Sequence, residues 1–324
     1  MNDWRLPGGD AARQYYLTEP FHAVMIKNEG LQHIQQMLYE QGYITEPSIV
    51  MSVFLAKELR KPLLIEGPAG VGKTEIAKVM SRALNTDLIR LQCYEGLDAT
   101  HAIYEWNYQQ QLLRLKMDEQ SGKTLEEKER DIFSERFLLK RPLLQAITHH
   151  KAPVLLIDEI DRADEEFESF LLEVLSDWQI SIPEIGTIKA SHIPQVIVTS
   201  NRVRELSEAL RRRCLYLYIS YPEFEKELQI VRSKVPGIDE DLSRQICTFM
   251  QEVRQMRLEK VPGIAETLDW AMALSALHID HLDKSIVEST LGIVLKDWQD
   301  IRHTQDSLSE LFEKVGAISK LEDL

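Results

Sequence analysis

The 324-residue chain contains few cysteines and no long apolar segment. Cys93, Cys214 and Cys247 are far apart and form neither a Cys-x-x-Cys pair nor an even set, so each is expected to be a small buried apolar residue. No stretch approaches the roughly 20 apolar residues of a membrane span. Residues 1–10 lack the apolar core of a signal peptide. These absences predict a cytoplasmic protein without a membrane span.

Basic residues are also in deficit. The chain has 38 Lys and Arg residues against 52 Asp and Glu residues, which gives a formal net charge of −14. An acidic surface repels phosphodiester backbones at long range, so nucleic acid is disfavoured as a partner, although a local basic patch could still bind it. An apolar content of 44% is that of a soluble globular protein, and the length is sufficient for two domains.

A glycine-rich loop is the most informative segment. It follows the apolar run 63–65 and precedes the amphipathic stretch 75–80. Its pattern is Gly-x4-Gly-Lys-Thr, formed by Gly67, Pro68, Ala69, Gly70, Val71, Gly72, Lys73 and Thr74. Such a turn directs backbone N–H groups and the positive end of a helix dipole at one point, where the phosphates of ATP fit. We expect Lys73 to reach the β and γ phosphates and the Thr74 hydroxyl to reach Mg²⁺. A glycine turn that only permits close packing is the alternative, and the Lys-Thr pair argues against it.

Two further apolar runs end in polar side chains. Residues 154–157 lead into Asp158 and Glu159, and residues 196–200 lead into Asn201. Parallel sheets bind ligands at the carboxyl ends of their strands. Asp158 is therefore expected to hold Mg²⁺ through its water shell, and Glu159 to orient and deprotonate the attacking water. Asn201 would touch the γ-phosphate or that water, unless it is simply a turn residue.

Three consecutive arginines, Arg211, Arg212 and Arg213, follow in an otherwise acidic chain. They could form a basic helix C-terminus, where cations suit the helix dipole. They could instead provide an arginine finger to the site of a neighbouring subunit, which raises the rate of phosphoryl transfer roughly 10³–10⁵-fold. We favour the finger, which requires an oligomer.

The chain is predicted to have three parts. Residues 1–42 are an N-terminal extension with scattered aromatic residues, and residues 222–324 are a smaller, all-helical domain. In residues 43–221, helical and strand patterns alternate, which predicts an α/β fold with a mostly parallel sheet and helices on both faces. The expected strands are 62–66, 87–93, 153–157, 195–200 and 215–220.

Two irregularities interrupt this alternation. Sixty residues lie between Cys93 and Val154, far more than a strand-to-strand crossover needs, so an insertion is expected there. Residues 180–190 alternate around Gly186, which predicts a β-hairpin projecting from the sheet.

In this order, the phosphate loop, the Asp-Glu strand, the polar-ended strand, the arginines and the helical domain resemble those of AAA+ ATPases, over roughly residues 40–280. The insertion together with the hairpin is similar to the MoxR branch. Four segments resemble the CoxD-like ATPases, which act in maturation of the molybdenum–copper centre of carbon monoxide dehydrogenase. These segments are Gln-Cys-Tyr-Glu-Gly-Leu-Asp at 92–98, Tyr-Glu-Trp-Asn-Tyr at 104–108, Ser-Glu-Arg-Phe-Leu-Leu at 134–139, and Pro-Gly-Ile-Ala-Glu-Thr-Leu-Asp-Trp at 262–270.

The resemblance implies a role for each matching residue. The loop binds the nucleotide, Asp158 and Glu159 are the Mg²⁺ and water pair, and Asn201 is sensor 1. Arg213 matches the finger best, with Arg212 as its close competitor. Many relatives have a lid arginine (sensor 2) where this chain reads Ala-Glu-Thr at 265–267. The aromatic side chains of Tyr94 and Trp106 either face a client or belong to the core.

The implied function is ATP-driven remodelling of a client metalloenzyme by a ring of identical subunits. The resemblance implies a hexamer and an adaptor of the von Willebrand factor A type. Two alternatives stay open: a DNA-dependent AAA+ motor, which the charge of −14 disfavours, and a nucleotide-binding regulator without productive hydrolysis.

Overall fold

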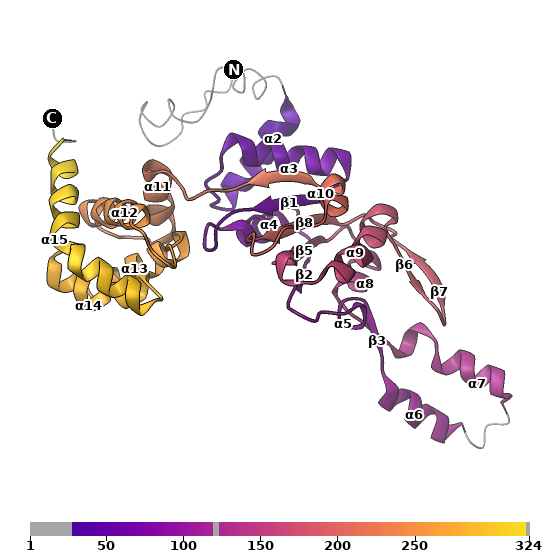
Figure 1. Ribbon diagram of the computed structural model, residues 1–324. Coiled ribbons are helices and arrows are strands. Elements are labelled where there is room, and N and C mark those ends of the chain that lie inside the picture. Colours follow the sequence, from indigo (N-terminus) through magenta and orange to yellow (C-terminus); the bar gives the residue numbers. More distant parts are fainter. Residues whose placement is uncertain (1–27, 119–122, 322–324) are drawn as a thin grey trace. The chain divides into compact units, whose positions relative to one another are not determined.

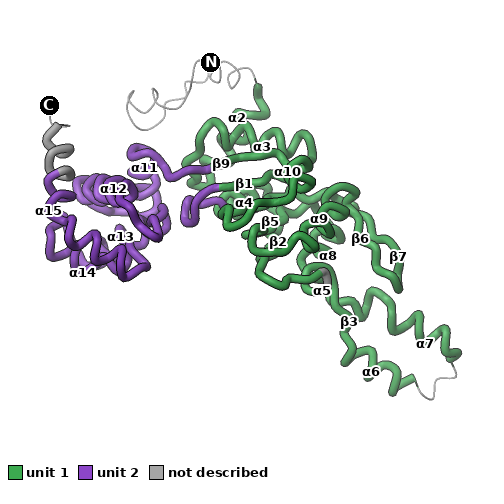
Figure 2. Tube along the Cα trace, viewed as in Figure 1, with its two compact units in different colours: residues 1–66, 74–218 green, residues 67–73, 219–324 purple. Residues whose placement is uncertain are grey.

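A computed structural model describes residues 28–118 and 123–321 of the chain (Figure 1). The chain divides into two compact units, shown in different colours in Figure 2. The first comprises residues 1–66 and 74–218, and the second comprises residues 67–73 and 219–324. The aromatic residues of the predicted extension, Trp4, Tyr15, Tyr16 and Phe21, lie outside the described residues.

The first unit is built on a five-stranded parallel sheet with the order β2-β5-β8-β1-β9. The predicted α/β class is confirmed, and the strands differ from the predicted ranges by at most two residues at either end. Every residue of β1 and β5 is buried, which explains why these strands are continuous apolar runs rather than alternating ones. The five strands are β1 (Leu63–Glu66), β2 (Leu88–Gln92), β5 (Val154–Asp158), β8 (Gln195–Ser200) and β9 (Leu215–Tyr218).

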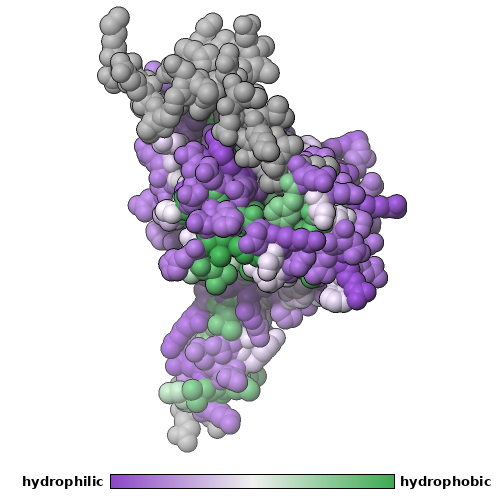
Figure 3. Space-filling view, turned by 90° about the vertical axis from the view of Figure 1, so that its left-hand side faces the viewer, coloured by the Kyte–Doolittle hydropathy of each residue, from purple (hydrophilic) through white to green (hydrophobic). Residues whose placement is uncertain are grey.

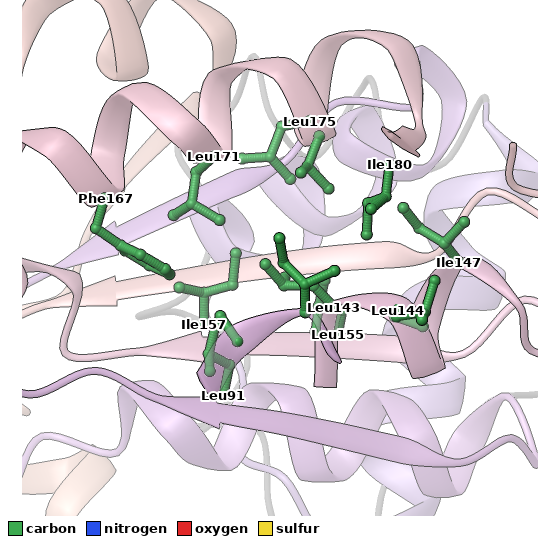
Figure 4. Close-up of a cluster of buried hydrophobic side chains, with 14 of the residues drawn as sticks. Leu91, Leu143, Leu144, Ile147, Leu155, Ile157, Phe167, Leu171, Leu175 and Ile180 are labelled. Carbon is green, nitrogen blue, oxygen red and sulfur yellow. The ribbon is translucent and has the colours of Figure 1, made fainter. Parts of the chain in front are cut away.

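Helices cover this sheet. Apolar residues of α9 recur every four positions, at Phe167, Leu171 and Leu175, so they form one face that packs on the strands (Figure 4). The Asp164 side chain caps that helix by accepting a hydrogen bond from the Phe167 amide at 2.8 Å. The helices of the unit outside its insertion are α2 (Glu29–Glu40), α3 (Pro47–Leu59), α4 (Lys73–Ala83), α8 (Pro142–Ile147), η3 (Ile160–Arg162), α9 (Glu165–Asp177) and α10 (Glu208–Arg213).

Both predicted irregularities are present. The insertion between β2 and β5 carries two helices on a two-stranded ribbon, and a hairpin precedes β8 (Figure 1). Trp106 is only 6% exposed and packs edge-on against Tyr104 and Phe133, so it is a core aromatic, whereas Tyr94 is exposed. The elements are α5 (Ala99–Ala102), β3 (Tyr104–Trp106), α6 (Tyr108–Met117), α7 (Leu125–Ile132), η2 (Glu135–Phe137) and β4 (Leu138–Lys140), and in the hairpin β6 (Gln179–Ile182) and β7 (Gly186–Lys189).

The second unit is helical, as predicted, and residues 219–321 contain no strand. Its core surrounds the fully buried side chains of Phe249 and Trp270, whose ring centroids are 5.3 Å apart. Within the described ranges, no helix of either unit is long and apolar enough to cross a membrane. The helices of the second unit are α11 (Phe224–Lys234), α12 (Glu240–Gln255), α13 (Ile264–Ala276), α14 (Lys284–Val294) and α15 (Trp298–Leu321).

Candidate nucleotide site

The phosphate loop lies between β1 and α4. Its glycines Gly67, Gly70 and Gly72 have φ angles of 157°, 76° and 91°, a region that side-chain-bearing residues rarely adopt. The Lys73 side chain is buried within the loop, where its Nζ donates hydrogen bonds to the carbonyls of Gly67 at 2.8 Å and Pro68 at 2.6 Å. The loop backbone therefore adopts a conformation that favours glycine, and two of its carbonyls hold the Lys73 amine.

Asp158 is buried at the carboxyl end of β5, where three side chains contact its carboxylate. Thr74 Oγ1 donates to Oδ1 at 3.1 Å, and Thr199 Oγ1 donates to the same oxygen at 2.5 Å. Arg90 approaches Oδ2 with Nε at 3.0 Å and with a second guanidinium nitrogen at 2.5 Å. Thr74 and Asp158, the two side chains expected to hold Mg²⁺, are thus in hydrogen-bond contact with each other.

Glu159 follows directly and is held by donors from three elements. It adopts a left-handed conformation with φ of 55°, and its amide donates to Thr199 Oγ1 at 2.9 Å. Gln92 Nε2 lies 3.1 Å and Arg162 Nε 2.8 Å from Oε2, and Asn201 Nδ2 lies 3.4 Å from Oε1. The carboxylate is therefore oriented and only partly exposed, which suits a group that binds and deprotonates a water molecule.

Asn201 is positioned through its backbone as well as its side chain. The buried carboxylate of Asp161 accepts hydrogen bonds from the amides of Asn201 at 3.1 Å and Val203 at 2.8 Å. This fixes the turn after β8 next to the end of β5. Asn201 thus lies in the turn after β8, and its side chain contacts Glu159.

The carboxylates create a negative field at this edge of the sheet. Burial, and then the charges of Asp158, Asp161 and Glu159, raise the pKa of the Cys93 thiol to about 12. A hydroxyl and a carboxylate oxygen are ligands that Mg²⁺ accepts, and Mg²⁺ is usually held by one or two carboxylates together with substrate phosphates. The Thr74 and Asp158 side chains therefore fit Mg²⁺, although no group of three or more His, Cys, Asp or Glu side chains in the described ranges could hold a metal alone.

The three arginines of α10 have different partners. Arg211 pairs with the buried carboxylate of Glu66 at 3.2 Å, and Arg212 pairs with Glu208 on the exposed face of the helix. Arg213 Nε donates to Ser176 Oγ at 2.8 Å, and its Nη1 donates to the carbonyl of Ala209 at 3.2 Å. In the described residues of this chain, neither Arg212 nor Arg213 contacts Asp158 or Glu159.

Sequence reasoning missed Arg90, Gln92, Thr199, Asp161 and Arg162. The sequence indicates only that Arg90 and Gln92 share one face of a strand, whereas the pairing of β2 with β5 places Gln92 opposite Asp158. Thr199 is brought to Asp158 by the pairing of β5 with β8, whereas Asp161 lies in η3, just after β5 in the sequence.

The sheet order, the glycine-rich loop between β1 and α4, and the Asp-Glu pair at the end of β5 define a P-loop fold of the AAA type. Residues 62–214 match the family described as AAA domain (dynein-related subfamily).

Among curated proteins, an uncharacterized protein of Staphylococcus haemolyticus is 25% identical over 263 residues, which are 78% of this chain and 92% of that protein. The gas vesicle ATPase GvpN of Haloferax mediterranei is also 25% identical, over 78% of this chain and 72% of its own. Among solved structures, a mutant of RuvB from Thermotoga maritima is 17% identical with a TM-score of 0.45, over 76% of this chain and 68% of that chain.

Proposed function

We propose that the chain is an AAA+ ATPase of the MoxR type that hydrolyses ATP in an oligomeric ring, a hexamer, to remodel a client protein. The 25% identity to the gas vesicle ATPase GvpN supports the MoxR branch. The observation that carries hydrolysis is the arrangement of Glu159, which three donors orient beside the pair formed by Asp158 and Thr74.

Each residue of the site has a role in this proposal. The loop amides and Lys73 would bind the phosphates, and Thr74 and Asp158 would hold Mg²⁺, which would neutralise phosphate charge. Glu159 accepts the proton of the attacking water, and Asn201 holds the Glu159 carboxylate and that water in place. Gln92 and Arg162 occupy Oε2 of Glu159, so Oε1 is the oxygen that faces the weaker donor and accepts the proton.

The ring is proposed because an arginine finger needs a neighbour. Arg211 and Arg212 are neutralised by carboxylates, whereas the described contacts of Arg213 are to a hydroxyl and a carbonyl. Among the described residues, no carboxylate forms an ion pair with Arg213 at the exposed end of α10, which favours it over Arg212 as the finger. A charge supplied in this way stabilises the transition state of phosphoryl transfer in the adjacent subunit.

The inserted helices have a charged and polar interface between them. Gln111 is buried and its Nε2 donates to the carbonyl of Ile132 at 2.7 Å. Arg114 Nε lies 3.0 Å from Asp131 Oδ2, and Lys123 Nζ lies 3.3 Å from Asp118 Oδ2. The two helices are therefore joined by an ion pair and a buried hydrogen bond, where a helical hairpin normally buries apolar side chains.

Their apolar side chains point outward instead. Tyr108, Leu112, Leu113 and Met117 on α6, and Leu125 on α7, are each at least 60% exposed. Figure 3 shows hydrophobic residues, in green, among hydrophilic ones at the bottom of the view, where this insertion lies. Exposed apolar side chains gathered in this way mark interaction sites, and Tyr108 and Leu112 are one helical turn apart, as in helices that dock into apolar grooves. We propose that this outward face binds an apolar groove of the client protein.

By resemblance, the client is a molybdenum hydroxylase or carbon monoxide dehydrogenase-type metalloenzyme, and an adaptor of the von Willebrand factor A type assists. Affinity capture with Glu159→Gln, which is expected to hold ATP without cleaving it, tests this assignment. Recovery of a molybdenum-hydroxylase subunit supports it, and recovery of gas-vesicle or methanol-oxidation components assigns the chain to another MoxR function.

Steady-state turnover of the same variant tests hydrolysis. Removing a general base slows proton transfer by about 10²–10⁴-fold, so Glu159→Gln should lose nearly all turnover and still bind ATP. The matched control is Glu166→Gln, which removes an exposed carboxylate from the first turn of α9 and should leave turnover unchanged. Equally slow turnover by wild type and Glu159→Gln would favour the regulator without hydrolysis. A several-fold increase of turnover by duplex or single-stranded DNA at low salt would favour the DNA motor.

A further inference from the structure

Within the second unit, the phosphate loop contacts the start of helix α13. The carbonyl oxygen of Gly70 accepts hydrogen bonds from the amides of Ile264 at 3.0 Å and Ala265 at 3.4 Å. Ile264 and Ala265 are the first two residues of α13, and such amides have no partner inside their own helix. The phosphate loop therefore caps the helix.

The two segments approach so closely that only glycine fits on either side. A Cβ atom built on Gly263 would lie 2.7 Å from the backbone Cα and C atoms of Gly70. A Cβ on Gly70 would lie 3.1 Å from Gly263 Cα, and Gly70 also has a φ of 76°. Gly263 itself has a φ of −92°, which any residue adopts, so its requirement for glycine comes from the contact alone.

The Glu266 side chain also lies at the contact between Gly70 and Gly263. Its Oε2 accepts a hydrogen bond from the Gly263 amide at 2.8 Å and would lie 3.1 Å from a Cβ atom on Gly70. A carboxylate in the first turn is stabilised by the helix dipole, but it repels a phosphate. At the position where the resemblance leads us to expect a lid arginine, the chain thus has an anion engaged in capping its own helix.

A buried ion pair holds the turn that makes this contact. The Arg254 guanidinium, whose side chain is 5% exposed, binds the carboxylate of Glu227 with two bonds of 2.6 Å. The same guanidinium donates to the carbonyls of Pro262 at 2.9 Å and Gly263 at 3.3 Å. Residues 261–266 are therefore tied to the core of the helical unit.

We propose that the helical unit senses the nucleotide through the backbone of the phosphate loop. The clasp formed by Gly70, Gly263, Ile264, Ala265 and Glu266 takes the place of a charged side chain reaching the γ-phosphate. Nucleotide binding changes the position of the Gly70 carbonyl, and α13 follows because its first amides are bonded to that oxygen. The inference rests on the proposed function only in requiring that the loop binds a nucleotide.

Hydrogen exchange of the Ile264 and Ala265 amides tests the clasp. Gly263→Ala is the perturbing variant, and Gly292→Ala is the matched control, because a Cβ atom there meets no heavy atom within 4 Å. Without nucleotide, both amides should exchange about fivefold to tenfold faster in Gly263→Ala, as expected for loss of a hydrogen bond, and at wild-type rates in Gly292→Ala. With ADP bound, their exchange should change in wild type and stay constant in Gly263→Ala, while fluorescent ADP still binds both proteins.

Glu266 provides a second test that does not crowd the loop. Glu266→Ala removes the acceptor of the Gly263 amide and should speed exchange at Ile264, whereas Glu266→Gln keeps an acceptor and should restore most of the protection. The inference is overturned if ADP binds to wild type and leaves both amides unchanged, or if Gly263→Ala exchanges like wild type. Hydrogen exchange needs no ATP turnover. A protein that binds ADP but fails to hydrolyse ATP would therefore contradict the proposed function and leave the inference about the clasp unaffected.

Discussion

Removing the guanidinium of Arg254 should destabilise the helical unit more than any exposed substitution. In Arg254→Ala the carboxylate of Glu227, which is fully buried, loses both of its charge-assisted hydrogen bonds. The carbonyls of Pro262 and Gly263 each lose a donor as well. Breaking a buried ion pair by removing one partner costs about 3–5 kcal/mol, which is a large fraction of the net stability of about 5–15 kcal/mol of a typical domain.

Urea unfolding followed by far-UV circular dichroism and tryptophan fluorescence measures this loss. With an m-value of about 2 kcal/mol per molar urea, a loss of about 4 kcal/mol lowers the midpoint by about 2 M. The control Arg257→Ala removes an exposed arginine one turn beyond the same pair and should change stability by less than about 0.5 kcal/mol.

The double variant with Arg254→Met and Glu227→Leu distinguishes an unpaired charge from lost packing. Replacing both charges by apolar side chains of similar volume is often neutral or stabilising, so the double variant should recover most of the stability that Arg254→Ala loses. An Arg254→Ala protein that unfolds within about 0.5 kcal/mol of wild type would refute the argument that the buried carboxylate depends on this guanidinium.

Three further predictions concern the arginine finger, the insertion and the thiol. Arg213→Ala should bind ATP normally, but ATP turnover by the assembled ring should fall about 10³-fold or more. Arg212→Ala should keep most of the turnover. Equal losses in the two variants would reject Arg213 as the finger. Replacing Leu112 and Leu113 by Ser should abolish client capture without changing turnover, because both side chains are already exposed; retained capture would contradict the docking face. Burial, and then the nearby carboxylates, raise the pKa of the Cys93 thiol to about 12. The folded protein therefore favours the neutral thiol, and this contribution to the free energy of unfolding is complete below about pH 8.5. It is lost as the pH rises toward 12, at up to about 1.4 kcal/mol per pH unit. Under reducing conditions, the stability of Cys93→Ala should fall less steeply between pH 8.5 and 10 than that of wild type; parallel slopes would exclude this linkage.

The strands, the phosphate loop and the β-hairpin could be predicted from the sequence because each depends on neighbouring residues. A strand buried on both faces is a continuous apolar run, as in residues 154–157, and a glycine with positive φ marks a turn wherever it occurs. Asp158 and Glu159 were identifiable for the same reason, since a carboxylate that directly follows a buried strand is placed at the ligand-binding edge of a parallel sheet.

The tertiary structure alone decided which side chains surround those carboxylates. Arg90 and Thr199 reach Asp158 because β2 and β8 pair with opposite sides of β5, and strand order is a property of long-range pairing that local periodicity does not encode. The same holds for Gly70 and Gly263, whose contact depends on how a distant turn packs against the loop. Local sequence thus determined the backbone of the phosphate loop and the two carboxylates, whereas nonlocal packing determined what holds them in place.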